Sequence, residues 1–212
     1  MTVVFDLDDT LYSEREYWYS GMRAVSETVS HLYGCSSDEC QRILAADSPD
    51  PFGQLVDHLG LAPKVKESLI NIYRFHEPSI KLYPSAQSLI NRLLGSESVA
   101  ILTDGRSITQ RLKVKSLGLE GIPLYISEEF CSEKPEPKRF TQIEKDLPGD
   151  RFVYIGDNPA KDFEAPNALG WKTIGLLNAG HNIHIQTIDG LKVGCQPQFW
   201  VSNFDEIYAL LC

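Results

Sequence analysis

The chain has 212 residues, 42% of them hydrophobic and 23% charged, which is enough for one α/β domain with a smaller insert. Its formal net charge of −9 argues against a nucleic acid or an anionic membrane as a partner, because both require a basic surface. We expect no leader segment, because the first residues are neither basic nor a long apolar stretch, and no membrane span, because no apolar run approaches ~20 residues. The five cysteines are scattered, so we expect reduced thiols and a cytoplasmic protein.

The chain opens with a predicted strand that ends in a cluster of carboxylates. Apolar residues 3–5 lead into Asp6-Leu-Asp8-Asp9-Thr10. Alternate side chains of a strand share a face, so Asp6 and Asp8 point one way and Asp9 the other. Two carboxylates on one side of a strand end repel each other unless a cation or a shared proton offsets the repulsion. We interpret the pair as a nucleophile and an acid/base partner beside a metal, since a helix N-cap would explain only one of the acids.

The next segment, from Ser13 to about Pro78, is predicted to be helical, with breaks at Gly34, 47–51 and 60–63. Beyond it, helices and strands alternate. The predicted helices cover 85–94, 107–117, 137–145, about 160–169 and 204–211, and the predicted strands cover 99–102, 124–126, 152–155, 173–177 and 199–201. This alternation predicts a parallel sheet covered on both faces. Because the first strand belongs to the sheet, we expect residues 13–80 to be a helical insert in a core formed by 1–12 and 81–212.

Reactive residues follow three of the predicted strands. Ligands bind outside the carboxyl ends of the strands in open parallel sheets. The residues concerned are Asp6 and Asp8 after the first strand, Thr103-Asp104-Gly105 after the second, Asp157 with Asp162 one turn further on, and Lys134 in a loop. Their order along the chain therefore predicts one site that gathers acids, a hydroxyl and a lysine.

These residue types suit phosphoryl transfer. Asp6 and Asp157 supply hard oxygen ligands of the kind that Mg²⁺ prefers. A carboxylate can attack phosphorus and form an aspartyl-phosphate, while Asp8 is placed to protonate the leaving oxygen and then to deprotonate water. Thr103 and Lys134 can hold the phosphoryl oxygens as these acquire charge.

The turn after Thr103 supplies further candidates for binding phosphate or substrate. The first amides of the helix that follows Gly105 attract anions. Asp104 either orders this loop or contacts a water bound to the metal. Arg106 and Lys161 flank the motifs, and each is compatible with binding substrate or with a solvated position at the start of a helix.

The four motifs together resemble those of the haloacid dehalogenase (HAD) superfamily phosphatases. They are Asp6-Leu-Asp8-Asp9-Thr10, Thr103, Lys134-Pro-Glu-Pro and Gly156-Asp157-Asn-Pro-Ala-Lys-Asp162. The resemblance spans nearly the whole chain and implies a HAD-like Rossmannoid core, a doubly wound parallel sheet, with a small all-helical cap inserted after the first motif.

The resemblance also implies a role for each matching residue. Asp6 would be the nucleophile and Asp8 the general acid/base. The Asp6 carboxylate, the Asp8 backbone carbonyl and Asp157 would hold Mg²⁺. Thr103 and Lys134 would bind phosphate, and Asp162 would orient Lys134 or the waters on the metal.

We therefore predict an enzyme that hydrolyses a small phosphate monoester, a sugar phosphate or a nucleotide, with Mg²⁺ and an aspartyl-phosphate intermediate. Dehalogenating relatives lack the acid two residues after the nucleophile and need no Mg²⁺, so Asp8 and Asp157 favour phosphate chemistry. A phosphomutase of the β-phosphoglucomutase kind is the alternative. A phospho-aspartate signalling domain fits less well, because receiver domains have no helical insert. The identity of the ester and the oligomeric state are left open.

Overall fold

The computed structural model describes residues 1–46, 48–178, 180, 182–183, 186–187, 190 and 194–211. It divides into two compact units, one formed by Met1–Arg15 with Lys81–Cys212 and the other by Glu16–Ile80. No helix in the described part of the chain is both long enough and apolar enough to cross a membrane.

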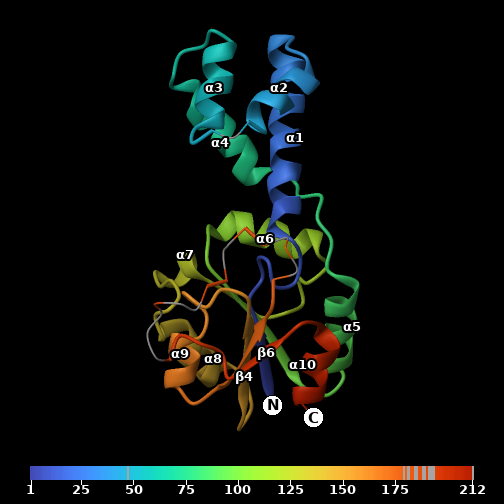
Figure 1. Ribbon diagram of the computed structural model, residues 1–212, viewed down its shortest axis with the longest axis vertical. Coiled ribbons are helices and arrows are strands. Elements are labelled where there is room, and N and C mark those ends of the chain that lie inside the picture. The colour runs from blue at the N-terminus through green and yellow to red at the C-terminus, as the bar shows by residue number, and fades with distance from the viewer. Residues whose placement is uncertain are drawn as a thin grey trace. The chain divides into compact units, whose positions relative to one another are not determined.

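The first unit is built on a six-stranded sheet whose neighbouring strands all pair in parallel (Figure 1). The strands are β1 (Thr2–Phe5), β2 (Ser98–Thr103), β3 (Leu124–Ile126), β4 (Phe152–Gly156), β5 (Lys172–Leu176) and β6 (Phe199–Val201), in the order β3-β2-β1-β4-β5-β6. The predicted α/β class with a parallel sheet is confirmed. Because β1 lies between β2 and β4, the carboxyl ends of these three strands meet at one edge of the sheet.

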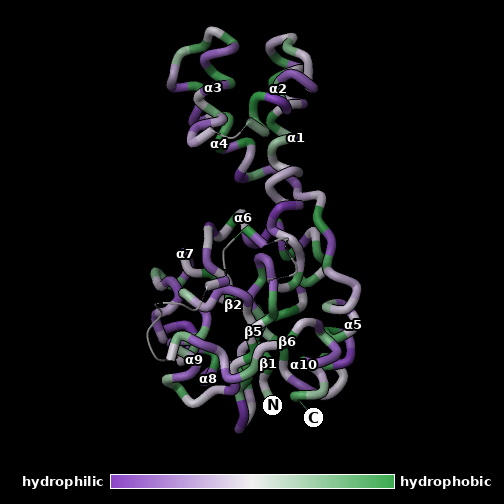
Figure 2. Tube along the Cα trace, viewed as in Figure 1, coloured by the Kyte–Doolittle hydropathy of each residue, from purple (hydrophilic) through white to green (hydrophobic). Residues whose placement is uncertain are grey.

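Helices cover both faces of this sheet. They are α5 (Pro84–Leu93), α6 (Ser107–Ser116), α7 (Ser127–Phe130), α8 (Lys138–Asp146), α9 (Glu164–Ala168) and α10 (Phe204–Leu211). Figure 1 shows α8 and α9 on one side of the strands and α5 with α10 on the other. Val4, Ala100 and Tyr154 share one register level and pack against Phe140 of α8. The hydrophobic colouring of the central strands in Figure 2 reflects this burial on both faces.

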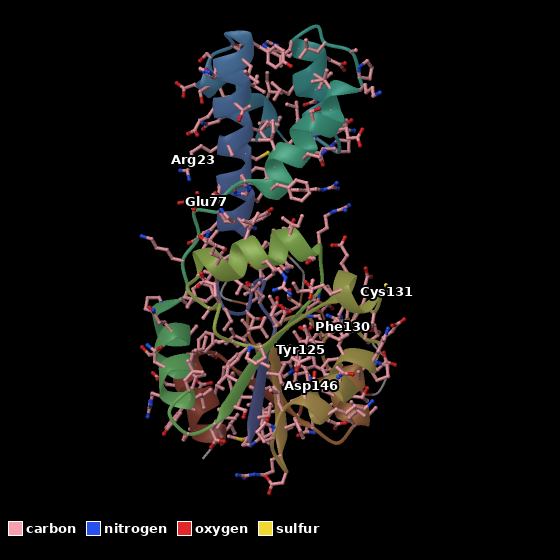
Figure 3. All side chains as sticks on the ribbon, turned by 180° about the vertical axis from the view of Figure 1, so that it is seen from behind. Arg23, Glu77, Tyr125, Phe130, Cys131 and Asp146 are labelled. Carbon is pink, nitrogen blue, oxygen red and sulfur yellow. The ribbon has the colours of Figure 1, made fainter. Side chains whose placement is uncertain are left out.

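Two details of the first unit differ from the sequence-based prediction. The helix predicted near 160–169 is shorter and covers only Glu164–Ala168. The side chains of Asn158 and Asp162 bond the backbone of the preceding turn instead. Asp162 Oδ2 accepts from Asn158 N at 2.8 Å, and Asn158 Oδ1 accepts from Ala160 N at 3.1 Å. The four-residue helix α7 was not predicted. Tyr125 of β3 anchors it by packing on Phe130, with ring centroids 5.7 Å apart (Figure 3).

The second unit is helical. It contains most of α1 (Glu14–Tyr33), followed by α2 (Ser37–Leu44), α3 (Pro51–His58) and α4 (Val65–Phe75). Its core is formed by apolar side chains from all four helices: Met22, Val25, Val29, Cys40, Leu44, Leu55, Val56 and Leu69. Asp50 caps α3, since its Oδ1 accepts from Gly53 N at 2.9 Å. This unit therefore has a hydrophobic core of its own.

Candidate active site

The predicted site residues gather at the carboxyl ends of β1, β2 and β4. A cavity of about 210 Å³ opens there. It is lined by Asp6, Asp8, Glu14, Thr103, Asp104, Lys134, Asp157, Asn158 and Lys161. Strand pairing places these residues together although they are far apart in the sequence, as expected for a parallel sheet.

Lys134 lies between two buried carboxylates. Its Nζ is 2.6 Å from Asp6 Oδ1 and 2.7 Å from Asp162 Oδ1, and it also bonds the hydroxyl of Tyr154 at 3.2 Å. Burial raises the pKa of Asp6 well above its ordinary value, although the nearby Lys134 opposes the shift. Burial alone would lower the pKa of Lys134, but Asp162 and Asp6 outweigh it and raise that pKa. The lysine is thus held as a cation beside Asp6.

Asp157 adds a third carboxylate to this group. One oxygen from each of Asp6, Asp157 and Asp162 lies within 4.8 Å of the other two, and all three residues are buried. Burial, followed by the charge of Asp162, raises the pKa of Asp157 to about 7. When all three carboxylates are ionised, the ammonium of Lys134 balances only one of their charges. Buried carboxylate oxygens at this spacing with excess negative charge fit a hard divalent cation such as Mg²⁺.

Asp8 is held by a different set of partners. It accepts hydrogen bonds from the hydroxyl of Tyr12, from Gln110 Nε2 at 2.8 Å and from Lys113 Nζ at 2.7 Å. Burial alone would raise the pKa of Asp8, but Lys113 and the bonds from Tyr12 and Gln110 hold it below its ordinary value. The pKa values of Asp6 and Asp8 are therefore shifted in opposite directions, although both residues have a lysine partner and line the same cavity.

Asp9 belongs to the turn and not to the cavity lining. It has a positive φ of 54°. Its two oxygens accept from Glu14 N at 2.9 Å and from Ile183 N at 2.6 Å, so it caps the start of α1. Glu14 itself lines the cavity. Burial, followed by the charge of Asp8, raises the pKa of Glu14 to about 7.

The turn after β2 differs in detail from the expectation for a phosphate-binding turn. Thr103 and Asp104 line the cavity, but the amide of Gly105 donates to Ser127 Oγ at 2.9 Å. The carboxylate of Asp104 accepts from Lys134 N at 3.2 Å and from the guanidinium of Arg139. Gly105 has a φ of 141°, which favours glycine. Asp104 and Gly105 thus order this loop.

Four residues of this region were missed in the sequence. Gln110 and Lys113 reach Asp8 from α6, Tyr154 reaches Lys134 from β4, and the fully buried Arg139 donates to Thr103 O at 2.8 Å from α8. The residues in helices were missed because a polar residue within a predicted helix is expected to face solvent. No pattern in the sequence of 107–117 distinguishes the two buried polar residues from the exposed ones.

These features define an α/β protein with a buried carboxylate site at the ends of its strands, and comparison with known proteins gives the family. Residues 3–176 match the model of the haloacid dehalogenase-like hydrolase family, so the chain belongs to this family and is an enzyme. The predicted family is thereby confirmed.

Named relatives and a solved structure agree with this assignment. The chain is 29% identical over 194 residues to glyceraldehyde 3-phosphate phosphatase of Methanopyrus kandleri, covering 82% of each protein. It is 30% identical over 134 residues to a pyrimidine 5′-nucleotidase of Escherichia coli, covering 61% of this chain and 56% of that one. The magnesium-bound HAD-hydrolase YfnB of Bacillus subtilis has the same fold, with a TM-score of 0.66, 19% identity and 99% and 97% of the two chains covered.

Proposed function

We propose that the protein hydrolyses a small phosphate monoester in the presence of Mg²⁺, with Asp6 as the nucleophile and Asp8 as the general acid/base. The observation that carries the proposal is the buried group formed by Asp6, Lys134, Asp157 and Asp162, with Asp8 in the same cavity. The names of the two relatives support a phosphorylated small molecule, a sugar or triose phosphate or a nucleotide, as the substrate class.

The proposed reaction has two steps. In the first, an Asp6 carboxylate oxygen attacks phosphorus, the ester P–O bond breaks, and the leaving oxygen takes a proton from Asp8. Without ligands the pKa of Asp6 is raised and that of Asp8 is lowered, so this step requires the bound cation to lower the pKa of Asp6 and the anionic phosphate to raise that of Asp8. In the second, Asp8 takes a proton from a water that attacks the same phosphorus, so that inorganic phosphate leaves and the Asp6 carboxylate is restored. Asp8 returns to its starting protonation state after each turnover.

The other residues of the site would bind the phosphate and the metal or orient the residues that do so. Lys134, held beside Asp6 at 2.6 Å, would bind a phosphoryl oxygen together with the hydroxyl of Thr103. Asp162 holds Lys134 in place at 2.7 Å. The Asp6 carboxylate, the Asp8 carbonyl and Asp157 would hold Mg²⁺, which would neutralise charge between the nucleophile and the anionic phosphate.

The proposal also includes the role of the helical segment and the location of the protein. From the family resemblance, residues 13–80 would act as a cap that selects the leaving group and excludes water. The cysteines among the described residues are unpaired, which supports a reducing, cytoplasmic location.

The proposal is tested with a panel of sugar phosphates, nucleotides and short phospho-acids, assayed for phosphate release with Mg²⁺ and with EDTA. We expect at least one ester to be hydrolysed only with Mg²⁺, and Asp6→Asn to lower its turnover by a factor of about 10³ or more. Asp205→Asn, an exposed acid on α10, is the matched control. Full activity of Asp6→Asn would overturn the proposal, and phosphate returned to another position of the sugar would identify a phosphomutase.

A further inference from the structure

Two polar side chains of α6 contact Asp8 although the proposed reaction assigns them no role. Gln110 and Lys113 lie three residues apart on one face of the helix and are only 1% and 4% exposed. Lys113 Nζ is 2.7 Å from Asp8 Oδ1, and Gln110 Nε2 is 2.8 Å from Asp8 Oδ2. The carboxylate is therefore held at both oxygens by one rigid element.

Gln110 also connects Asp8 to Thr103. The same Nε2 lies 2.6 Å from Thr103 Oγ1 and 3.1 Å from the carbonyl of Asp104. Because the hydroxyl oxygen of Thr103 accepts this bond, its proton is directed to a different acceptor. In the proposed reaction that acceptor is a phosphoryl oxygen.

A buried ion pair is weak evidence for a purely stabilising role. Apolar residues of similar size often stabilise a buried position as well as an ion pair does, because the pair must offset the loss of hydration. Lys115, two residues further along α6, is exposed to solvent. The fold has instead buried Lys113 against a carboxylate that lines the candidate active site.

We propose that Gln110 and Lys113 are positioning residues for the general acid/base step. They hold the Asp8 carboxylate in the orientation that meets the leaving oxygen, and Gln110 also directs the hydroxyl of Thr103 toward the phosphoryl group. This inference rests on the proposed phosphatase function.

The leaving group of the substrate provides the test. An alkoxide needs a proton as the P–O bond breaks, whereas p-nitrophenolate leaves without one. Lys113→Met should therefore lower kcat/KM for an alkyl phosphate by about 10- to 100-fold and change kcat/KM for p-nitrophenyl phosphate much less. Gln110→Leu should affect both esters, the alkyl one more, because it also releases Thr103.

Lys115→Met is the matched control and should leave both esters unchanged. Lys113→Arg, which restores a cation, should recover part of the loss on the alkyl ester. An equal loss of kcat/KM on the two esters, or no loss on either, would overturn the positioning role while leaving the phosphatase function intact. The alkyl phosphate is chosen among those that the panel shows to be hydrolysed, and failure of the unaltered enzyme on the whole panel would overturn both.

A separate cluster in the helical unit carries a second inference. Cys35, Glu39 and His58 each offer one ligand atom within 4.8 Å of the other two. Cys35 Sγ is 3.8 Å from Glu39 Oε2, and His58 Nε2 is 3.2 Å from Glu39 Oε1. The buried Cys40 places its sulfur 3.0 Å from that of Cys35.

The distances from Glu39 to Cys35 and to His58 are close to those of a tetrahedral zinc site. With Zn–S near 2.3 Å and Zn–N or Zn–O near 2.0 Å, the ligand atoms stand about 3.5 Å apart for S and O and about 3.3 Å apart for N and O. The sulfur of Cys40 lies beside that of Cys35 but outside this group of three, so it would have to move toward Glu39 and His58 to become a fourth ligand. The nearby guanidinium of Arg42 bonds the carbonyl of Asp38 at 3.3 Å.

We infer that Cys35, Glu39 and His58 bind a thiophilic divalent metal such as Zn²⁺, with the sulfur of Cys40 next to this group. The metal would link α2 and the residues before it to the end of α3. Because Mg²⁺ prefers oxygen ligands, this site and the candidate active site would select different cations.

Cobalt(II) reports directly on this coordination. When it is added to the EDTA-treated, reduced, full-length protein, we expect a thiolate-to-cobalt charge-transfer band that saturates at one equivalent and persists in excess Mg²⁺. Cys35→Ser and His58→Gln should abolish or shift the band, whereas Cys131→Ser, an exposed cysteine of the other unit, should not. Absence of the band in the unaltered protein, or an unchanged band in Cys35→Ser, would overturn the inference.

Discussion

Lys134 Nζ lies 2.6 Å from Asp6 Oδ1, and both side chains are less than a tenth exposed. The same ammonium is 2.7 Å from Asp162. A loop lysine and the end of the first strand, 128 residues apart in the sequence, thus form one buried ion cluster. Because buried charges are costly unless paired, Lys134 supports the local structure as well as the proposed chemistry.

Lys134→Met should therefore affect stability as well as activity. The substitution leaves Asp6 and Asp162 buried without their cation, which costs about 3–5 kcal/mol of unfolding free energy. Urea unfolding in EDTA measures this loss, and we expect Mg²⁺ to restore part of it by offsetting the same charges. Lys145→Met, on the exposed side of α8, should unfold as the unaltered protein does. A Lys134→Met variant of unchanged stability would contradict the electrostatic role.

Site residues that directly follow a strand can be predicted well from the sequence. The residues that support them through tertiary contacts can be predicted only poorly. Asp6, Thr103 and Asp157 could be grouped because parallel pairing brings the ends of β1, β2 and β4 to one edge. Gln110 and Lys113 could not be added to this group, because their partner Asp8 is more than 100 positions away in the sequence. A polar residue in a helix is assumed to face solvent until tertiary contacts are known.

Arg139 gives a second test of such a supporting residue. It is fully buried and donates to Thr103 O at 2.8 Å, to Tyr125 O at 3.3 Å and to the carboxylate of Asp104. We expect Arg139→Met to lower the unfolding free energy by about 2–4 kcal/mol. Arg139→Lys should recover only part, because an ammonium cannot reproduce the fork of guanidinium donors.

Thermal unfolding of both Arg139 variants checks this prediction, with the exposed Arg151→Met as control. Because the Arg139 bonds fix the Thr103 carbonyl, the turnover of Arg139→Lys should also fall. A variant that loses neither stability nor turnover would show that the buried guanidinium is dispensable.

Glu14 makes stability depend on pH. Burial raises its pKa from 4.5 to about 7, so the folded protein holds this proton more tightly than the unfolded chain. The stability that Glu14 contributes is therefore fully present below pH 4.5 and is lost as the pH rises to about 7. Glu14→Gln should be more stable than the unaltered protein by roughly 1–3 kcal/mol at pH 8, and the gain should shrink toward pH 5.

Urea unfolding in EDTA at several pH values measures this dependence. Glu16→Gln is the control. The side chain of Glu16, two residues further along the helix, is exposed, so we expect no such gain in stability. A pH-independent difference between Glu14→Gln and the unaltered protein would indicate that packing, and not the carboxylate charge, is responsible.

Magnesium should stabilise the protein through Asp157. A ligand present at 100 times its dissociation constant stabilises the folded state by about 2.7 kcal/mol, so Mg²⁺ should raise the midpoint of thermal unfolding measurably. In Asp157→Asn we expect this response to disappear. The metal-free variant should be at least as stable as the metal-free parent, because the substitution removes one of three mutually repelling buried carboxylates.

This pair of results separates metal binding from general damage to the site. A disruptive substitution would lower the unfolding free energy both with and without Mg²⁺. Loss of a metal-binding carboxylate removes only the gain in stability that Mg²⁺ gives. Asn182 Nδ2, which donates to Asp157 Oδ2 at 2.6 Å, can still donate to the amide oxygen of asparagine, so the local hydrogen bond does not confound the comparison. Asp205→Asn should respond to Mg²⁺ as the unaltered protein does. An Asp157→Asn variant that still gains the full Mg²⁺ response would remove Asp157 from the metal site, because the carboxylate charge would then be unnecessary for binding.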